Sequence, residues 1–191
     1  MNKKIIIIAG YLASGKSTFA VRLSKAINVP YLVKDTFKIA LCKSIKINVR
    51  EESSLFSVVT FNAMMYITGR LIETGFPVII EGNFVPAGIK KVDEAATIKA
   101  VIDKYDCRSL IYKFTGETSV FHKRFVEREK SPERGQVNTL FFEPSVDDFD
   151  RWCHNLDTFD VGGEIIKIDT TDFAKVDFKG HIKTAQIFVD G

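Results

Sequence analysis

The sequence predicts an α/β protein in which a parallel β-sheet is covered by helices on both faces. Short aliphatic runs alternate with longer amphipathic segments along the whole chain, an order that is typical of β-α-β units. The first aliphatic run, at residues 4–9, is continuous and rich in isoleucine, which is typical of a strand buried on both faces. It leads directly into the glycine-containing turn GYLASGKST at residues 10–18.

The other elements follow from their own local patterns. Further strands are expected at residues 30–33, 77–82, 108–115 and 164–169. Helices are expected, from helical spacing of apolar residues and from Gly, Asn or Pro at their ends, at residues 16–27, 36–46, 54–74, 87–104, 117–130, 146–157 and 174–189. Loops are expected at the polar residues 47–53 and at the proline-containing residues 131–145. No repeat or boundary interrupts this order, so residues 1–191 are expected to form a single domain.

The composition limits the class of protein. The 46% hydrophobic content and the mild net charge of +3 fit a folded domain and do not by themselves indicate a nucleic-acid partner. Cys42, Cys107 and Cys153 are far apart and form no zinc motif, which fits a reducing, cytoplasmic location. No apolar stretch reaches 18 residues, so no membrane span is expected, and the N-terminal apolar run is too short for a secretory signal.

Residues 10–18 match the phosphate-binding pattern G-x-x-x-x-G-K-S between a strand and a helix. Backbone N–H groups of residues 11–17 and the helix dipole are expected to hold phosphate oxygens. Lys16 is expected to reach the β- and γ-phosphates, and the Ser17 hydroxyl is expected to bind Mg²⁺. The predicted nucleotide contacts of this turn are Gly10, Ala13, Ser14, Gly15, Lys16, Ser17 and Thr18.

Acidic residues accompany the second and third predicted strands. Asp35 follows the second strand, and Glu81 lies in the third. Because the carboxyl ends of parallel strands meet at one edge of a sheet, both acids should lie beside the phosphate-binding turn. We interpret Asp35 as the general base that accepts the proton of an acceptor hydroxyl, with a helix N-cap as its alternative role. Glu81 is interpreted as a metal ligand through water or as a contact to the acceptor, the alternative being a satisfied acid at a strand end.

Three motifs, GYLASGKST, LVKDTFK and VIIEGNF, together resemble the small P-loop kinase superfamily. The pattern is similar to a group that includes zeta-toxin-like kinases, polynucleotide 5′-kinases and chloramphenicol phosphotransferase-like enzymes. The resemblance implies a three-layer P-loop NTPase fold with a five-stranded parallel sheet of order 2-3-1-4-5. It also implies ATP and Mg²⁺ as cofactors, transfer of the γ-phosphoryl group to a hydroxyl, and the general-base role for Asp35.

Arginines are concentrated in the charged segment FHKRFVEREKSPERG at residues 121–135, at positions Arg124, Arg128 and Arg134. Arg124 and Arg128 are four residues apart and share a helix face. An arginine fork matches the charge that spreads over a transferring phosphoryl group, so all three are candidates for catalysis. The resemblance implies that residues near 117–145 form a lid that closes over ATP and excludes water. The alternative is a solvated helix with internal ion pairs.

Two further segments are assigned by the same resemblance. The stretch after the fifth strand is expected to lie beside adenine, with Thr170 in contact with the nucleotide, and a plain turn is the alternative. Residues 36–62 are expected to line the acceptor pocket. Their lysines could meet a phosphate or a nucleic-acid backbone, or lie on a solvated helix face.

The sequence therefore favours an ATP- and Mg²⁺-dependent kinase that phosphorylates a hydroxyl of a small molecule. One alternative is the same chemistry on the 5′-hydroxyl of a nucleic acid or on a nucleotide sugar, as in zeta-toxin-like kinases. Another, from a different class, is a regulatory NTPase without an acceptor. Asp35 argues against the last alternative, because a nucleotide switch needs a group that positions water rather than an acceptor base.

Overall fold

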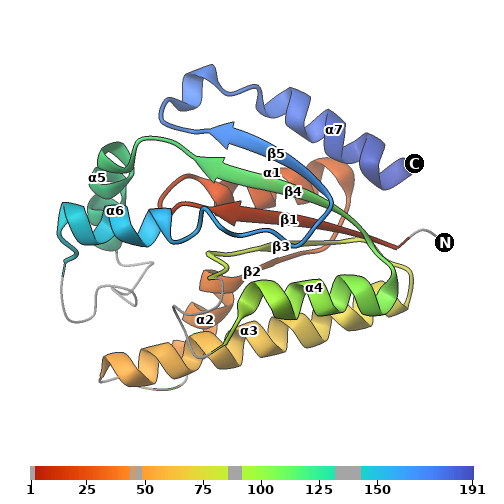
Figure 1. Cartoon of the computed structure of the whole chain (residues 1–191), viewed down its shortest axis with the longest axis horizontal. Helices are drawn as coiled ribbons and strands as arrows, with labels where there is room; N and C mark the ends of the chain where they lie inside the picture. The colour runs from red at the N-terminus through yellow and green to blue at the C-terminus, as the bar shows by residue number, and fades with distance from the viewer. Residues whose placement is uncertain (1–2, 44, 46–48, 86–91, 132–142) are drawn as a thin grey trace.

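The computed structural model describes residues 3–43, 45, 49–85, 92–131 and 143–191. Within them, five strands form a parallel sheet of order β2-β3-β1-β4-β5, which confirms the predicted order (Figure 1). The strands are β1 (Lys4–Gly10), β2 (Tyr31–Val33), β3 (Val78–Glu81), β4 (Arg108–Thr115) and β5 (Glu164–Asp169). The helices are α1 (Lys16–Ile27), α2 (Lys34–Cys42), α3 (Arg50–Glu73), α4 (Glu94–Tyr105), α5 (Thr118–Glu129), α6 (Val146–His154) and α7 (Phe178–Asp190).

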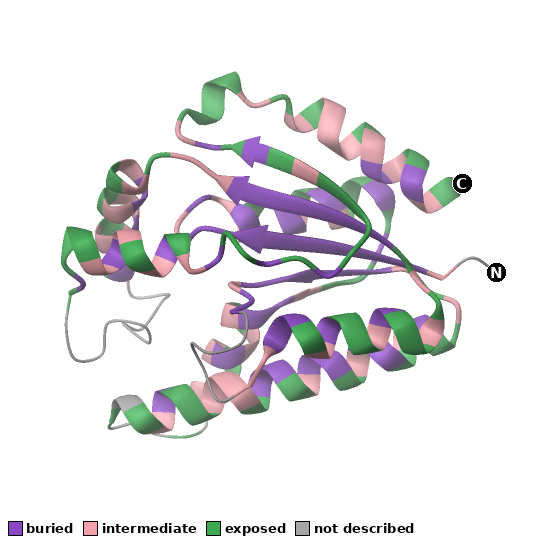
Figure 2. Ribbon diagram, in the orientation of Figure 1, coloured by how far each residue is buried: buried purple, intermediate pink, exposed green. Residues whose placement is uncertain are grey.

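Different helices cover the two faces of the sheet, because alternate side chains of a strand point to opposite faces. Ile5 and Ile7 of β1 pack in one core with residues of α3 and α4, whereas Ile6 and Ile8 pack in a second core with residues of α1 and α7. All four isoleucines are completely buried, as the buried central strands in Figure 2 illustrate. The fold is therefore the three-layer α/β arrangement that the continuous apolar strands predict.

A third and smaller core lies beyond the carboxyl ends of the strands. Tyr11 packs there with Phe121 and Phe125 of α5 and with Phe149 and Cys153 of α6. All five side chains are buried. This cluster attaches α5 and α6 to the turn that follows β1, at the end of the sheet where the arrowheads point in Figure 1.

Helix α3 begins at Arg50, so the expectation of a loop over residues 47–53 is wrong for residues 50–53. The backbone N–H of Val49 donates to Glu52 at 3.4 Å, and Lys38 Nζ donates to the Ser53 hydroxyl at 2.8 Å. Acidic residues in a first turn also complement the positive end of the helix dipole. The polar residues 50–53, which suggested a loop, therefore form the first turn of α3.

Helix α2 begins at Lys34 rather than at residue 36 and ends at Cys42, and α6 ends at His154 rather than at residue 157. Helices α4 and α7 begin later than expected, because an aspartate caps each of them. Helix α4 begins at Glu94 rather than near residue 87, where the Asp93 carboxylate accepts the Ala96 N–H at 2.9 Å. The helix expected over 174–189 is a 3₁₀ turn, Phe173–Lys175, followed by α7. Residues 86–91 and 132–142, and with them most of the loop expected at 131–145, lie outside the described residues.

One helix of the described chain, α3, is long and apolar enough to cross a membrane by length and composition alone. Its mean hydropathy reaches 1.4 between Glu51 and Glu73. This differs from the expectation that no segment of that kind occurs. Phe61, Met64 and Ile72 of this helix are completely buried in the core that it shares with α4 and the sheet. Core helices of globular proteins pass the same test, so the finding is weak evidence for a membrane span.

Gly10, where β1 ends, is expected to be required for folding. Its φ is 118°, and a Cβ atom there would lie 2.1 Å from the carbonyl oxygen of Phe114 on β4. Gly10→Ala should therefore lower the free energy of unfolding by about 3 kcal/mol or more, from backbone strain and overlap together. Urea denaturation would measure the loss. Gly162→Ala is the matched control, because Gly162 also has a positive φ of 78° but has open space around it. If the two variants lose the same free energy of unfolding, the close approach of Gly10 to the Phe114 carbonyl oxygen is not what requires glycine at this position.

Candidate active site

The turn between β1 and α1 is held in shape by its own hydrogen bonds. The Tyr11 carbonyl oxygen accepts the Ser14 hydroxyl at 2.7 Å and also accepts the ammonium of Lys16. Ala13 and Gly15 have positive φ angles of 56° and 90°, which turn the chain sharply before α1 begins. The turn thus precedes a helix N-terminus, the arrangement that favours anion binding.

Lys16 is buried beside two carboxylates. Only 5% of its surface is exposed. Burial lowers the pKa of its ammonium below the ordinary value, and the nearby charges of Glu81 and Asp35 act in the opposite direction. A buried ammonium among acids is well placed to meet an anionic phosphate chain that enters the turn.

The two predicted metal ligands, Ser17 and Glu81, are in contact. The Ser17 hydroxyl, in the first turn of α1, donates to Glu81 Oε2 at 3.0 Å, and Glu81 is 4% exposed at the end of β3. Two oxygen ligands in adjacent octahedral positions around Mg²⁺ lie about 2.9 Å apart, for metal–oxygen distances of about 2.0–2.1 Å. This oxygen pair therefore fits the ion. No group of three or more His, Cys, Asp or Glu suited to a metal occurs in the described residues, so such an ion would rely on water and phosphate oxygens as well.

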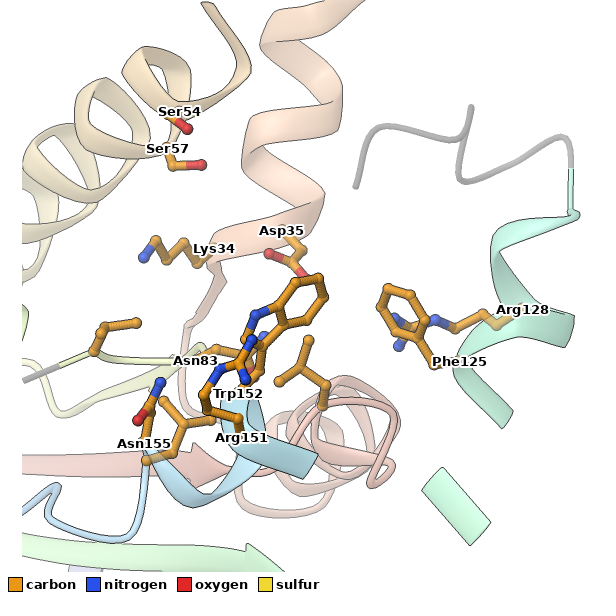
Figure 3. Close-up of a pocket in the computed structure, with 13 residues that line it drawn as sticks. Lys34, Asp35, Ser54, Ser57, Asn83, Phe125, Arg128, Arg151, Trp152 and Asn155 are labelled. Carbon is orange, nitrogen blue, oxygen red and sulfur yellow. The ribbon is translucent and has the colours of Figure 1, made fainter. Parts of the chain in front are cut away.

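Asp35 lies in the first turn of α2 rather than at its N-cap, which is Val33. Val33 pairs with Glu81 across β2 and β3, so the two strands end together at the edge of the sheet that carries the turn. The carboxylate of Asp35 lines a cavity of about 510 Å³ and points toward its interior (Figure 3). The cavity is lined by Leu12, Lys34, Asp35, Ser54, Ser57, Asn83, Val85, Phe125, Arg128, Arg151, Trp152, Asn155 and Leu156.

The two described arginines of α5 point to different places, although they share a helix face. Arg128 lines the cavity, and its guanidinium pairs with Glu129 at 3.1 Å. The Arg124 guanidinium donates to the carbonyl oxygens of Thr170 and Thr171 at 2.8 and 2.7 Å. It also lies 4.2 Å from the centre of the Phe173 ring. Arg124 thus contacts the loop after β5, while Arg134 lies outside the described residues.

The loop after β5 forms a turn that lies against the turn between β1 and α1. Asp169 accepts the Thr171 N–H at 2.8 Å, which is the Asx-type bond of a plain turn. Thr170 is completely buried, and its hydroxyl has no hydrogen-bond partner among the described residues. The Phe173 ring would lie 2.8 Å from a Cβ atom at Gly15, so this loop packs directly on the turn. Thr18, by contrast, is exposed on α1.

Comparison with known proteins gives no match among protein-family models and none among curated proteins. Solved structures do match. A candidate kinase from Chloroflexus aurantiacus J-10-fl has a TM-score of 0.82 at 18% sequence identity, over 100% of this chain and 98% of that chain. A gluconokinase from Sinorhizobium meliloti 1021 has a TM-score of 0.56 at 14% identity, over 97% of this chain and 90% of that chain. A shikimate kinase from Bacteroides thetaiotaomicron also has a TM-score of 0.56, at 13% identity, over 98% of this chain and 99% of that chain.

This chain has the small P-loop kinase fold. The fold that the three sequence motifs imply is thereby confirmed, together with its strand order. In this fold, the turn that follows β1 lies at the same end of the sheet as Asp35 and Glu81.

Sequence reasoning missed most residues of the cavity wall. Trp152 and Asn155 come from α6 and the residue that follows it, and Asn83 follows β3. Asn83 could have been found, because it lies two residues after Glu81 at a strand end. The only sequence feature that distinguished Trp152 as a candidate site residue is that it is the single tryptophan of the sequence. Their position depends on how α6 packs, which local patterns do not specify.

A second group that sequence reasoning missed connects the turn after β1 to the end of α6. The Tyr11 hydroxyl donates to Asp157 Oδ1 at 2.8 Å, and His154 Nδ1 lies 2.9 Å from Asp157 Oδ2. Burial and the hydrogen bond to Asp157 raise the pKa of the Tyr11 hydroxyl well above its usual range. Tyr11 therefore stays neutral and keeps donating at physiological pH. The contact spans 146 positions of sequence, so only folding brings the two residues together.

This group is expected to make stability depend on pH. The hydrogen bond to Asp157 raises the pKa of His154 above its ordinary value of 6.5. Burial would raise the pKa of Asp157, but hydrogen bonds with His154 and Tyr11 lower it below 3.8. The raised pKa of His154 gives stability that is present below pH 6.5 and is lost as the pH rises through the folded value. The lowered pKa of Asp157 gives stability that is lost only as the pH falls below 3.8.

The free energy of unfolding lost in His154→Gln should therefore be largest at about pH 5.5 and should shrink toward pH 8.5. Urea denaturation of the wild type and the variant at both pH values would measure it. His181→Gln is the matched control, because burial lowers the pKa of His181 and its pH dependence should have the opposite sign. If His154→Gln loses the same free energy of unfolding at both pH values, the ion pair between His154 and Asp157 does not contribute to stability.

Proposed function

We propose that this protein is a kinase that transfers the γ-phosphoryl group of ATP, with Mg²⁺, to a hydroxyl group of a small molecule. The observation that carries the proposal is the cavity of about 510 Å³ that adjoins the phosphate-binding turn at Leu12 and is lined by Asp35 and Arg128. A phosphate site, a carboxylate and an arginine around one cavity are the parts that phosphoryl transfer requires.

The phosphate-binding turn would hold the nucleotide. Gly10, Ser14, Gly15 and the backbone N–H groups of the turn would surround the phosphates, and Lys16 would neutralise charge on the β- and γ-phosphates. The Ser17 hydroxyl and the Glu81 carboxylate would hold Mg²⁺ as adjacent oxygen ligands. When bound, this ion would neutralise negative charge on the phosphate chain.

Asp35 would act as the general base. The acceptor hydroxyl oxygen forms a bond to the γ-phosphorus while the bond from that phosphorus to the bridging oxygen breaks, and ADP leaves. The hydroxyl proton passes to the carboxylate of Asp35 as this happens. Arg128 lines the same cavity and would stabilise the negative charge on the transferring group.

Residues near 117–145 would serve as the lid of a single kinase domain spanning residues 1–191. Helix α5 carries Arg128 to the cavity wall and Arg124 to the loop after β5. Closing this segment would exclude water and direct the phosphoryl group to the acceptor. Thr170 and the loop around it would lie beside the adenine, and Arg134 would contribute further positive charge.

The test uses γ-labelled ATP, Mg²⁺ and pools of hydroxyl-bearing metabolites, nucleotide sugars and oligonucleotides. Label on a small-molecule product is the expected result. Label on an oligonucleotide or a nucleotide sugar would replace the small-molecule acceptor by one of those classes. Label found only as free phosphate, whatever is added, would contradict a kinase and favour a regulatory NTPase. The gluconokinase and shikimate kinase among the structural neighbours are named for small molecules, which supports the first outcome.

A further inference from the structure

Tyr11, in the turn between β1 and α1, has a hydrogen-bond partner for each of its polar groups. Its backbone N–H donates to the Phe114 carbonyl oxygen on β4 at 2.9 Å. Its carbonyl oxygen accepts the Ser14 hydroxyl and the Lys16 ammonium. Its side-chain hydroxyl donates to Asp157 Oδ1 at 2.8 Å. The residue that holds the ammonium of Lys16 at its peptide group is therefore also held at the far end of its side chain.

The hydroxyl bond adds direction to a side chain that is otherwise held by packing. The ring of Tyr11 is buried and meets Phe121 of α5 and His154 of α6 edge-on, with ring centres 6.4 and 5.7 Å away. Apolar packing of this kind is non-directional, whereas a hydrogen bond weakens steeply when its angle or distance changes. The bond to a carboxylate therefore specifies where the end of the ring lies.

Asp157 is itself fixed from two sides. Lys113, a buried lysine of β4, donates its ammonium to the backbone carbonyl oxygen of Asp157. The second carboxylate oxygen, Oδ2, lies 2.9 Å from His154 Nδ1. One contact attaches Asp157 to the sheet and the other attaches it to α6. It can therefore hold Tyr11 in place instead of following it.

The position of the Tyr11 peptide group matters for the proposed nucleotide site. Backbone N–H groups surround a phosphate only in one conformation of the turn, which includes the positive φ angles of Ala13 and Gly15. A turn that is already held in its binding conformation avoids the cost of being ordered when a ligand arrives. Asp157 is not one of the described residues that line the cavity. It would thus act through Tyr11 and not by touching a substrate.

We infer that Asp157 is a positioning residue for nucleotide binding, which accepts the Tyr11 hydroxyl and thereby holds the phosphate-binding turn in its binding conformation. The inference rests on the proposed function, because it concerns the nucleotide site of the same kinase. Two contacts of one residue carry it: the Tyr11 hydroxyl meets Asp157, and the Tyr11 carbonyl oxygen meets Lys16.

The first test measures the affinity for a non-hydrolysable ATP analogue with Mg²⁺ by calorimetry. Tyr11→Phe removes the hydroxyl and keeps the ring, and Asp157→Ala removes the acceptor. We expect each change to weaken binding about five- to tenfold, because the turn must then be ordered as the nucleotide binds. The double variant should bind as each single variant does, since both changes remove the same bond. Losses that add in the double variant would overturn the inference.

Two controls separate positioning from stability. Tyr112→Phe also removes a buried hydroxyl, one that donates to the His181 carbonyl oxygen at 2.6 Å, so it should lower stability and leave nucleotide affinity unchanged. Asp157→Asn is the conservative variant. Its amide oxygen still accepts the Tyr11 hydroxyl, so affinity should stay near the wild-type value although the charge that faces His154 is lost. An affinity that falls with stability in both controls would overturn the inference.

Hydrogen exchange in the nucleotide-free protein separates the inference from the kinase proposal. The backbone amides of residues 11 and 19, on either side of the turn, donate to the carbonyl oxygens of Phe114 and Gly15. Their exchange should be about fivefold faster or more in Tyr11→Phe and Asp157→Ala than in Tyr112→Phe, because the turn opens more often.

Each result of the exchange measurement has a separate meaning. Unchanged exchange would overturn the inference and leave the kinase proposal intact. Faster exchange with unchanged nucleotide affinity would overturn the role of Asp157 in binding. A wild-type protein that binds no ATP analogue would contradict the kinase proposal, and the exchange rates would still decide whether Asp157 holds the turn.

Discussion

Lys16→Ala is expected to abolish detectable phosphoryl transfer. The ammonium of Lys16 is buried, donates to the Tyr11 carbonyl oxygen and interacts with the charges of Glu81 and Asp35, so it would offset phosphate charge in a space with little water. Loss of one such group in a preorganised site costs about 10²–10³-fold in rate, and a full charge beside a triphosphate should reach at least the upper end of that range. Nucleotide affinity should fall as well, because the lysine would contact ATP before transfer.

The measurement is the initial rate of label transfer from γ-labelled ATP, with nucleotide binding followed separately by calorimetry. Lys25→Ala is the matched control, since Lys25 is an exposed lysine in the last turn of the same helix. Burial lowers the pKa of Lys16, so its ammonium is held in the fold at a cost and its removal should not unfold the protein. A folded Lys16→Ala protein that transfers phosphate at the wild-type rate would refute the site.

Asp35→Asn is expected to reduce transfer by about 10²–10⁴-fold, the usual contribution of a general base. The amide keeps the shape of the carboxylate but does not accept the hydroxyl proton. Because Asp35 lies in the wall of the cavity and not in the phosphate-binding turn, nucleotide affinity should change by no more than about threefold.

The comparison variant is Asp103→Asn, an exposed aspartate on α4 that pairs with Lys99. It should transfer phosphate at the wild-type rate. If Asp35→Asn also does so, the general-base role is wrong. If it loses nucleotide binding to the same extent as transfer, Asp35 acts in binding the nucleotide instead of in moving a proton.

The two arginines of α5 illustrate how far local spacing extends. Positions four apart share a helix face, and this predicts a common direction for Arg124 and Arg128. The long side chains nevertheless diverge, because the carbonyl oxygens of Thr170 and Thr171 attract one guanidinium and Glu129 attracts the other. Spacing along a helix specifies the direction in which a side chain leaves the backbone. The hydrogen-bond partners around it specify the position of the guanidinium.

The sequence by itself determined the parts of this protein that depend on short-range rules. A buried strand, a glycine turn and an amphipathic helix follow one another within residues 4–27, so the strand–turn–helix unit was predictable from neighbouring residues alone. The strand order was implied by family resemblance, and the meeting of Asp35 with Glu81 followed because parallel strands end at a common edge.

Only the tertiary structure decided what surrounds that turn. Lys34 and Glu94 are 60 positions apart, and Tyr11 and Asp157 are 146 apart, yet each pair is in contact. Contacts of this kind arise from the packing of α4 against α3 and of α6 against the turn, which depends on shapes and buried areas summed over many residues. The conformation of the turn after β1 could therefore be predicted from sequence, whereas the walls of the cavity beside it depended on the folded chain.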